Sequence, residues 1–171
     1  MKGAGQVRGI SAALKISVLN RQHACQVCTP RLRRLAVWLA QQAELASYST
    51  LDILLTDDAG SVTTNRAVFG RDYVTDVISL AYPALPTEPG AAGELVINVE
   101  LAAREGARRA GGPDRELALY LAHGCDHLAG ADDATPRQRA TMRRRELGWL
   151  RAAANAGLLQ GLLESTATAG A

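Results

Sequence analysis

The sequence is poor in aromatic residues and almost without lysine. Its 171 residues include one phenylalanine, two tryptophans and four tyrosines, and its only lysines are Lys2 and Lys15. No cluster of aromatic side chains stands out that would favour stacking on nucleic-acid bases. Positive charge is therefore carried by arginine, whose planar guanidinium is a good ligand for phosphate oxygens. A GC-rich genome produces the same arginine-rich and alanine-rich composition, so this bias alone identifies no partner.

Long apolar runs are also missing. No stretch of about 18 apolar residues occurs, so the sequence predicts no transmembrane helix. Residues 1–9 include basic residues but no long apolar segment follows them, which argues against a signal peptide. We therefore expect a cytoplasmic protein without a membrane partner.

Cysteine is scarce, at three residues. Three cysteines cannot form a disulfide framework, and a cytoplasmic chain keeps them reduced. His23, Cys25 and Cys28 form a His-x-Cys-x-x-Cys cluster, but no second ligand pair lies at zinc-finger spacing. We interpret the cluster as part of a variable loop, with a metal or redox role as the alternative.

The composition is that of an ordinary globular domain. Hydrophobic residues make up 47% of the chain and charged residues 21%, with a net charge of +2. This length and composition fit one domain with a hydrophobic core. We expect a flexible tail over residues 1–13, a single domain over residues 14–151, and a C-terminal tail over residues 152–171 that frays.

Hydrophobic periodicity predicts four strands and about five helices. The strands are expected at residues 14–19, 49–55, 76–81 and 94–99. The third of these is almost wholly apolar and is therefore expected in the centre of the sheet. The helices are expected at residues 29–44, 61–69, 99–110, 113–127 and 135–151.

The chain is organised around the segment His-Gly-Cys-Asp-His from His123 to His127. Residues four apart on a helix lie on one face, so both imidazoles point the same way. Gly130 can adopt a positive φ, which ends the helix and turns the chain back. Two neutral imidazoles and one carboxylate form a ligand set for a catalytic zinc ion. We predict one divalent ion, zinc in first place, bound by His123, His127 and Asp133, with Asp132 as the alternative third ligand.

The same segment resembles the signature of the YbeY family of endoribonucleases, which mature ribosomal RNA. That signature reads His-Gly-x-Leu-His-Leu-x-Gly-Tyr-Asp-His and is matched by His123, Gly124, His127, Leu128, Gly130 and Asp132. Asp126 stands where the family has leucine, Ala131 where it has tyrosine, and Asp133 where it has the third metal-binding histidine. The resemblance therefore implies an atypical member of the family, with a carboxylate as the third ligand.

The resemblance extends over residues 51–150. The further matches are Asp57-Asp58 with an acidic pair, Asn65 with an asparagine, residues 75–79 with Thr-Asp-Val-Leu-Ser, residues 93–97 with Gly-Asp-Ile-Val-Ile, and Glu116 with a glutamate that precedes the histidines. Their order implies the family's α+β, zincin-like fold, with a mixed sheet of about four strands and about five helices.

Two positions bear on the chemistry beside the histidines. Metalloproteases of the His-Glu-x-x-His type carry their general base directly after the first histidine, where this chain has Gly124. A glycine there removes the base, opens space beside the metal, and disfavours peptide hydrolysis. We interpret Asp126 as a residue that orients a histidine, and the sequence identifies no catalytic base.

Arginines are the candidates for contacts with RNA. The family's arginine before Gly-Lys-Asp aligns with Phe69 in this chain, and Arg71 aligns with the following lysine. The resemblance therefore implies Arg71 as a substrate-binding residue. Other candidates lie in the last predicted helix and could equally form a solvated surface: Arg137, Arg139, Arg143, Arg144 and Arg145.

The resemblance implies a single-strand-specific, metal-dependent endoribonuclease that acts in ribosomal RNA processing and ribosome quality control. Its expected partners are ribosomal RNA and the ribosome or ribosomal proteins, and no DNA. One alternative is a catalytically weakened RNA- or ribosome-binding module that keeps the fold. Another is a metal-dependent hydrolase of a different substrate, which Gly124 disfavours.

Overall fold

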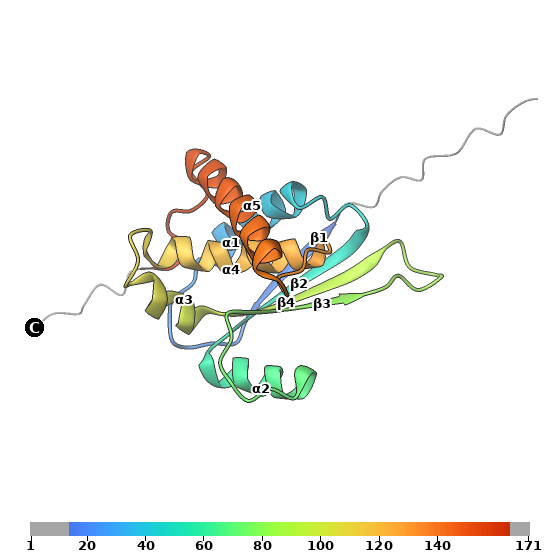
Figure 1. The fold of residues 1–171 in the computed structure, drawn as a ribbon, viewed down its shortest axis with the longest axis horizontal. Helices are drawn as coiled ribbons and strands as arrows, with labels where there is room; N and C mark the ends of the chain where they lie inside the picture. The colour runs from blue at the N-terminus through green and yellow to red at the C-terminus, as the bar shows by residue number, and fades with distance from the viewer. Residues whose placement is uncertain (1–13, 165–171) are drawn as a thin grey trace, which may run out of the picture.

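A mixed sheet of four strands runs through the middle of the computed structural model, which describes residues 14–164 (Figure 1). The strands lie in the order β1 (Lys15–Asn20), β2 (Tyr48–Thr56), β4 (Ala91–Asn98) and β3 (Val77–Tyr82). The first three are parallel, and β3 is antiparallel to β4. The predicted four-stranded mixed sheet is confirmed, whereas the predicted tail over residues 1–13 lies outside the described residues.

Within residues 14–164, five helices pack around the sheet or on one another, as the α+β assignment predicts (Figure 1). On one face lie α1 (Thr29–Gln42) and α4 (Gly112–Leu128), and α4 is flanked by α3 (Val99–Gly106) and α5 (Pro136–Asn155). On the other face lies α2 (Asp58–Phe69). No helix within residues 14–164 is long and apolar enough to cross a bilayer.

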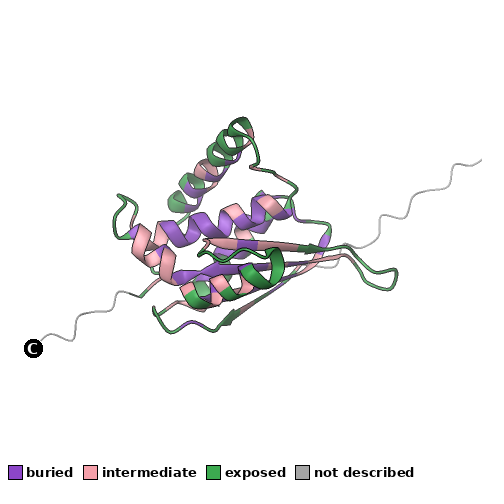
Figure 2. Ribbon diagram, turned by 60° about the horizontal axis from the view of Figure 1, so that its bottom comes forward, coloured by how far each residue is buried: buried purple, intermediate pink, exposed green. Residues whose placement is uncertain are grey.

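Helix α4 is the most deeply buried helix of the domain, because it lies between the sheet and α5 (Figure 2). Its apolar side chains, Leu117 and Leu121 among them, are fully buried together with Leu51 and Ile53 of β2. Those two residues lie two apart in β2, and every second side chain of a strand faces the same side of the sheet, here the side of α4. Burial of this helix fixes the position of the histidines that it carries.

Gly124 lets α4 approach the sheet closely. A methyl group at this position would lie 2.8 Å from Cδ2 of Leu95 and 3.1 Å from Cγ2 of Val77, which is too close for unstrained contact. The idea that Gly124 opens space beside the metal is therefore wrong, because strands β3 and β4 occupy the space next to it. The glycine removes the protease base and also permits close packing of helix and sheet.

Strand β3 lies at the edge of the sheet, so the expectation that it is central was wrong. Its apolar sequence has another cause, since the N-terminal half of the strand is covered on both faces. Val77 packs near Gly124 of α4, and Ile78, which is 3% exposed, points to the opposite face, on the side of α2. The apolar sequence of β3 thus reflects the burial of its two faces. It does not indicate how many strands lie beside it.

The prediction that the chain frays after residue 151 is wrong for residues 152–164. Helix α5 continues to Asn155, and Leu159 and Leu162 beyond it are buried in the core. Asp114 accepts hydrogen bonds from the backbone N–H groups of Gly161 and Leu163, each at 2.7 Å. This segment is therefore part of the domain, and residues 165–171 of the predicted tail lie outside the described part.

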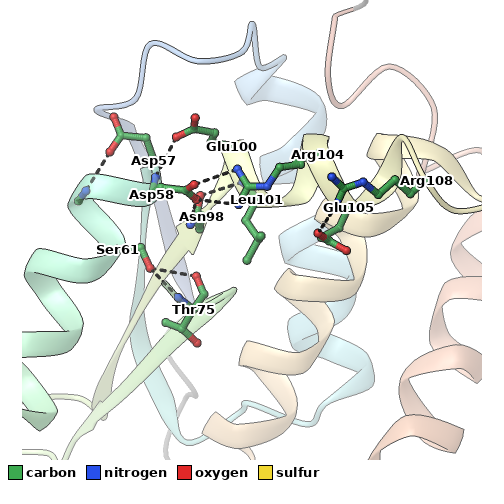
Figure 3. Close-up of polar contacts among 11 residues, drawn as sticks. Asp57, Asp58, Ser61, Thr75, Asn98, Glu100, Leu101, Arg104, Glu105 and Arg108 are labelled. Carbon is green, nitrogen blue, oxygen red and sulfur yellow. Dashed lines mark hydrogen bonds and ion pairs between the residues drawn. The ribbon is translucent and has the colours of Figure 1, made fainter. Parts of the chain in front are cut away.

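Polar contacts tie the carboxyl ends of β2 and β4 together (Figure 3). Asp57 caps α2 by accepting a hydrogen bond from Gly60 N at 2.9 Å. Asp58 accepts bonds from Asn98 Nδ2 at 2.8 Å and from Arg104 at 2.9 Å. Burial alone would raise the pKa of Asp58, but the bonds from Arg104 and Asn98 and the charge of Arg104 outweigh it and lower the pKa below its usual 3.8. The acidic pair thus has a structural role here.

Candidate metal centre

Two imidazoles face each other on the last turns of α4. The Nε2 atoms of His123 and His127 are 3.1 Å apart, and the ring planes meet at 77° with centroids 4.5 Å apart. The predicted i, i+4 placement on one helix face is therefore observed. Two nitrogens that bind one tetrahedral zinc ion at about 2.0–2.1 Å lie roughly 3.3 Å apart. The observed separation is close to that value.

The outer nitrogens of both rings are held by acceptors. His123 Nδ1 lies 2.6 Å from Oε1 of Glu146, and His127 Nδ1 lies 3.1 Å from the carbonyl oxygen of Ala131. A carbonyl oxygen and a carboxylate can only accept, so each neutral ring carries its proton on Nδ1. When both rings are neutral, neither Nε2 atom carries a proton, so two acceptor nitrogens lie 3.1 Å apart without a hydrogen bond between them and repel each other. A shared cation relieves this repulsion, so the imidazole pair fits a metal site.

Asp133 completes the candidate ligand set. One donor atom from each of His123, His127 and Asp133 lies within 4.8 Å of the others, and this is the only such group within residues 14–164. The carboxylate of Asp132 is engaged elsewhere, since it accepts hydrogen bonds from Ala134 N and Gln138 Nε2, each at 3.2 Å. The geometry groups Asp133, and not Asp132, with the histidines.

Glu146 of α5 is a part of the site that sequence reasoning missed. Its side chain is 4% exposed and holds His123 across the interface between α4 and α5. Burial lowers the pKa of His123, but the hydrogen bond and charge of Glu146, with the charges of Asp76 and Asp133, outweigh this and raise it above 6.5. A signal was present in the sequence, because Glu146 shares the spacing of the apolar face of α5, where Met142 and Leu150 are buried.

Asp126 does not orient a histidine, contrary to the interpretation of the sequence. It is buried, and it forms an ion pair with Arg145, whose Nε lies 3.1 Å from Oδ2. Burial raises the pKa of Asp126, and the bond and charge of Arg145 only partly offset this. Where the family has a leucine, this chain therefore has a polar link between α4 and α5.

A cleft of about 720 Å³ lies beside the candidate ligands, between α3, α4, α5 and the segment that precedes β3. Its lining includes both His123 and Asp133. The charged residues that line it are five carboxylates and three guanidinium groups: Asp76, Glu105, Glu116, Asp133, Glu146, Arg109, Arg139 and Arg143. The excess of two formal negative charges equals the charge of one divalent ion. The donor set and the charge of the cleft both fit a bound divalent cation.

Arg71, the predicted substrate-binding residue, lies outside this cleft, together with Phe69. Arg71 and Phe69 are exposed at the end of α2, where the Arg71 guanidinium lies 5.6 Å from the centre of the Phe69 ring. Neither residue lines the cleft. Substrate binding by Arg71 stays a prediction, whereas two other arginines, Arg139 and Arg143, reach the cleft.

The cysteine cluster near the N-terminus shows no metal-site geometry within the described residues. The side chain of Gln22 holds the loop by bonding the backbone N and O of Cys25, at 2.9 and 2.7 Å. Burial and, secondarily, the charge of Glu100 raise the pKa of the Cys25 thiol, which disfavours the reactive thiolate. These contacts agree with the interpretation as a loop.

The α+β fold and the histidine pair on its buried helix place the chain in the class of α+β proteins with a candidate site for one divalent ion. Within this class the chain belongs to the YbeY family, because the family model described as Endoribonuclease YbeY matches residues 17–153.

Relatives named Endoribonuclease YbeY resemble much of the chain. The one from Rhodopirellula baltica is 37% identical over 110 residues, which cover 63% of this chain and 56% of the relative. The one from Roseiflexus is 36% identical over 120 residues, 66% of this chain and 75% of the relative. The match to the first relative thus spans little more than half of that protein's length.

A solved structure supports the fold. The solution structure of a protein from Thermotoga maritima superposes with a TM-score of 0.55, covering 90% of this chain and 98% of that one. The two sequences are 16% identical, so this likeness concerns the fold alone.

Proposed function

We propose that this chain is a metal-dependent endoribonuclease that cleaves single-stranded RNA during ribosomal RNA processing. The observation that carries the proposal is the convergence of the two Nε2 atoms and the Asp133 carboxylate at the edge of a charged cleft. Membership of a family described as Endoribonuclease YbeY supplies the reaction class. Ribosomal RNA and the ribosome are the proposed partners.

The residues of the site are suited to hydrolysis of a phosphodiester bond. His123, His127 and Asp133 would hold the ion, which we propose to be zinc. Such an ion lowers the pKa of bound water and polarises the attacked group. Because two histidines and one carboxylate also suit manganese and iron, the set permits those ions as well. Glu146 and the Ala131 carbonyl fix the orientation of the two rings.

The position after the first histidine separates this proposal from peptide hydrolysis. Gly124 has no side chain to act as base, and the space beside it is filled by Leu95 and Val77. A protease-type glutamate therefore has no place at this position. Once a divalent ion offsets the excess of negative charge in the cleft, the arginines on its wall can face an anionic substrate that lies along it.

The test combines metal analysis with a nuclease assay on purified protein. We expect one equivalent of divalent metal, and cleavage of single-stranded ribosomal RNA fragments that a chelator stops and added metal restores. His127→Ala and Asp133→Ala should each lose both metal and cleavage, while Asp132→Ala should keep them.

Each result has a definite meaning. Metal binding with tight RNA binding but no cleavage would favour the RNA-binding module over the enzyme. Bound metal without cleavage or binding of RNA would contradict both and leave a hydrolase of another substrate. If Asp132→Ala loses the metal and Asp133→Ala retains it, the third ligand is Asp132 and not Asp133.

A further inference from the structure

The three arginines that line the cleft differ in the ion pairs and hydrogen bonds that their guanidinium groups form. Arg109 is paired with two carboxylates, Glu116 at 2.7 Å and Glu105 at 3.6 Å, and Glu116 is buried. The positive charge of Arg109 is therefore neutralised by the protein itself. Part of its hydrogen-bonding capacity is already used, so Arg109 is a poor candidate for binding an incoming anion.

Arg139 is engaged with the loop that carries the candidate third ligand. It donates hydrogen bonds from one terminal nitrogen to the carbonyl oxygens of Asp133 and Ala134, at 2.8 and 3.1 Å. These bonds help to fix the backbone of the loop before α5. Release of Arg139 towards a substrate would cost the loop this support, so we interpret Arg139 as a residue that positions Asp133.

Arg143 is the arginine of the cleft that remains free. Considering all contacts within residues 14–164, its guanidinium has neither an ion-pair nor a hydrogen-bond partner. It lies one helical turn after Arg139 and three residues before Glu146, so the three residues share one face of α5. Glu146 touches His123 directly. Arg143 is therefore placed on the wall of the cleft that adjoins the candidate metal centre.

The charge of the cleft explains why this arginine matters. Without a metal ion the lining carries an excess of two negative charges and repels a phosphate. One divalent ion neutralises that excess, and a free guanidinium then becomes the group able to bind a phosphate. Arg71 lies outside the lining, beside Phe69, so it does not supply this charge to the cleft.

We propose that Arg143 binds the phosphate at, or next to, the bond that is cleaved in a single-stranded RNA. This inference rests on the proposed function and names one residue that would carry out substrate binding. A guanidinium can donate two parallel hydrogen bonds to phosphate oxygens. In the cleft it would also oppose the negative charge that grows on those oxygens as phosphorus is attacked.

The test compares Arg143→Gln with Arg144→Gln, since Arg144 is the next residue of α5, is exposed, and does not line the cleft. In the metal-loaded protein we expect kcat/KM for RNA to fall about tenfold to a hundredfold in the first variant only, as for the loss of a hydrogen bond to a charged group. The slope of log kcat/KM against log salt concentration should become shallower by about 0.7, the value for one phosphate contact on a single strand. Metal content should be unchanged in both variants.

Further variants make the outcome decisive. Arg143→Lys keeps the charge but not the planar fork, so it should recover part of the lost kcat/KM while restoring the salt slope. Equal activity and equal salt slopes for Arg143→Gln and Arg144→Gln, with an active wild type, would overturn the role of Arg143 alone. A loss of activity in Arg71→Gln but not in Arg143→Gln would assign the contact to Arg71. A wild type that holds metal but neither binds nor cleaves RNA would overturn this inference together with the proposed function.

Discussion

At the scale of single residues, the site depends on what touches the far side of each imidazole. Glu146 holds His123 from α5, and the Ala131 carbonyl holds His127 from the loop after α4. Partners of this kind fix the tautomer and raise the basicity of a metal-binding histidine. The candidate ligands therefore form an arrangement whose ring orientations are set before any metal arrives.

Removal of the Glu146 contact should weaken metal binding. Glu146→Ala leaves His123 Nδ1 without its acceptor, so we expect the dissociation constant for zinc to rise about tenfold to a hundredfold. Glu146→Gln keeps an acceptor oxygen and should lose less. The measurement is competition with a chromophoric chelator at constant pH. Glu105→Gln is the matched control, because Glu105 lines the same cleft without contacting a histidine, and equal affinities in all four proteins would contradict the role of Glu146.

At the scale of secondary-structure elements, the contact of α4 with the sheet determines where the histidines stand. The helix can approach β3 and β4 because Gly124 has no side chain at the point of closest contact. A glycine within a helix normally costs about 1 kcal/mol relative to alanine. The close packing offsets this cost, and the two effects can be separated by mutation.

Gly124→Ala should destabilise the protein although alanine favours helix. The new methyl group would force Leu95 and Val77 aside, at a cost of about 1–3 kcal/mol, and the helix propensity would return about 1 kcal/mol. We expect a net loss of roughly 1 kcal/mol in the free energy of unfolding, measured by urea denaturation. Gly148→Ala on α5 meets nothing within 4 Å and should be stabilising. Stabilisation by both substitutions would show that the sheet does not constrain α4 at Gly124.

Asp58 lies at the junction between the sheet and helices α2 and α3, and its contacts should make the free energy of unfolding depend on pH in the acidic range. The folded-state pKa of Asp58 is lowered, so its contribution to stability is full above the unfolded value near 3.8 and is lost as pH falls through the folded value. Asp58→Asn should therefore lower stability at pH 7 and flatten its fall between about pH 5 and about pH 3. Urea denaturation across this range is the measurement. Asp72→Asn, which breaks an exposed pair with Arg66, should change little, and a pH profile of Asp58→Asn that matches the wild type would contradict this account.

At the scale of the whole molecule, the candidate site brings together α4, the loop that follows it, and α5. His123 and His127 lie on α4, Asp133 follows in the loop, and Glu146 comes from α5. A ligand that binds only the folded arrangement stabilises the entire domain. Metal binding should therefore be visible in global unfolding as well as in activity.

Zinc should raise the thermal stability of the wild type. At a free concentration about a thousand times the dissociation constant, binding adds about 4 kcal/mol to the free energy of unfolding. For a domain of this size that corresponds to an increase in Tm of roughly 10 °C. Scanning calorimetry with and without a chelator measures it, and His127→Ala should abolish the difference. A zinc-dependent rise of the same size in His127→Ala would place the ion elsewhere.

Local patterns in the sequence were sufficient for the elements and for the pair of candidate ligands. The spacing of His123 and His127 depends only on helix geometry, and alternation marked β2 because each strand residue faces a definite side of the sheet. The capping box of Thr135 and Gln138 that begins α5 is likewise a contact between near neighbours in the sequence. These features are encoded over a few residues, so no knowledge of the tertiary fold was needed.

Tertiary structure decided the features that depend on contacts between distant segments. The edge position of β3, the pairing of Asp126 with Arg145, and the support of His123 by Glu146 all join residues far apart in the sequence. Hydrophobicity reports that a residue is buried but not which neighbour buries it. The residues next to a buried acid in the sequence do not show which residue pairs with it either, because the compensating charge can come from any element that packs alongside. The sequence by itself thus determined the candidate metal ligands on α4, while only the packing of α4 against α5 determined what orients them and which arginine faces the cleft.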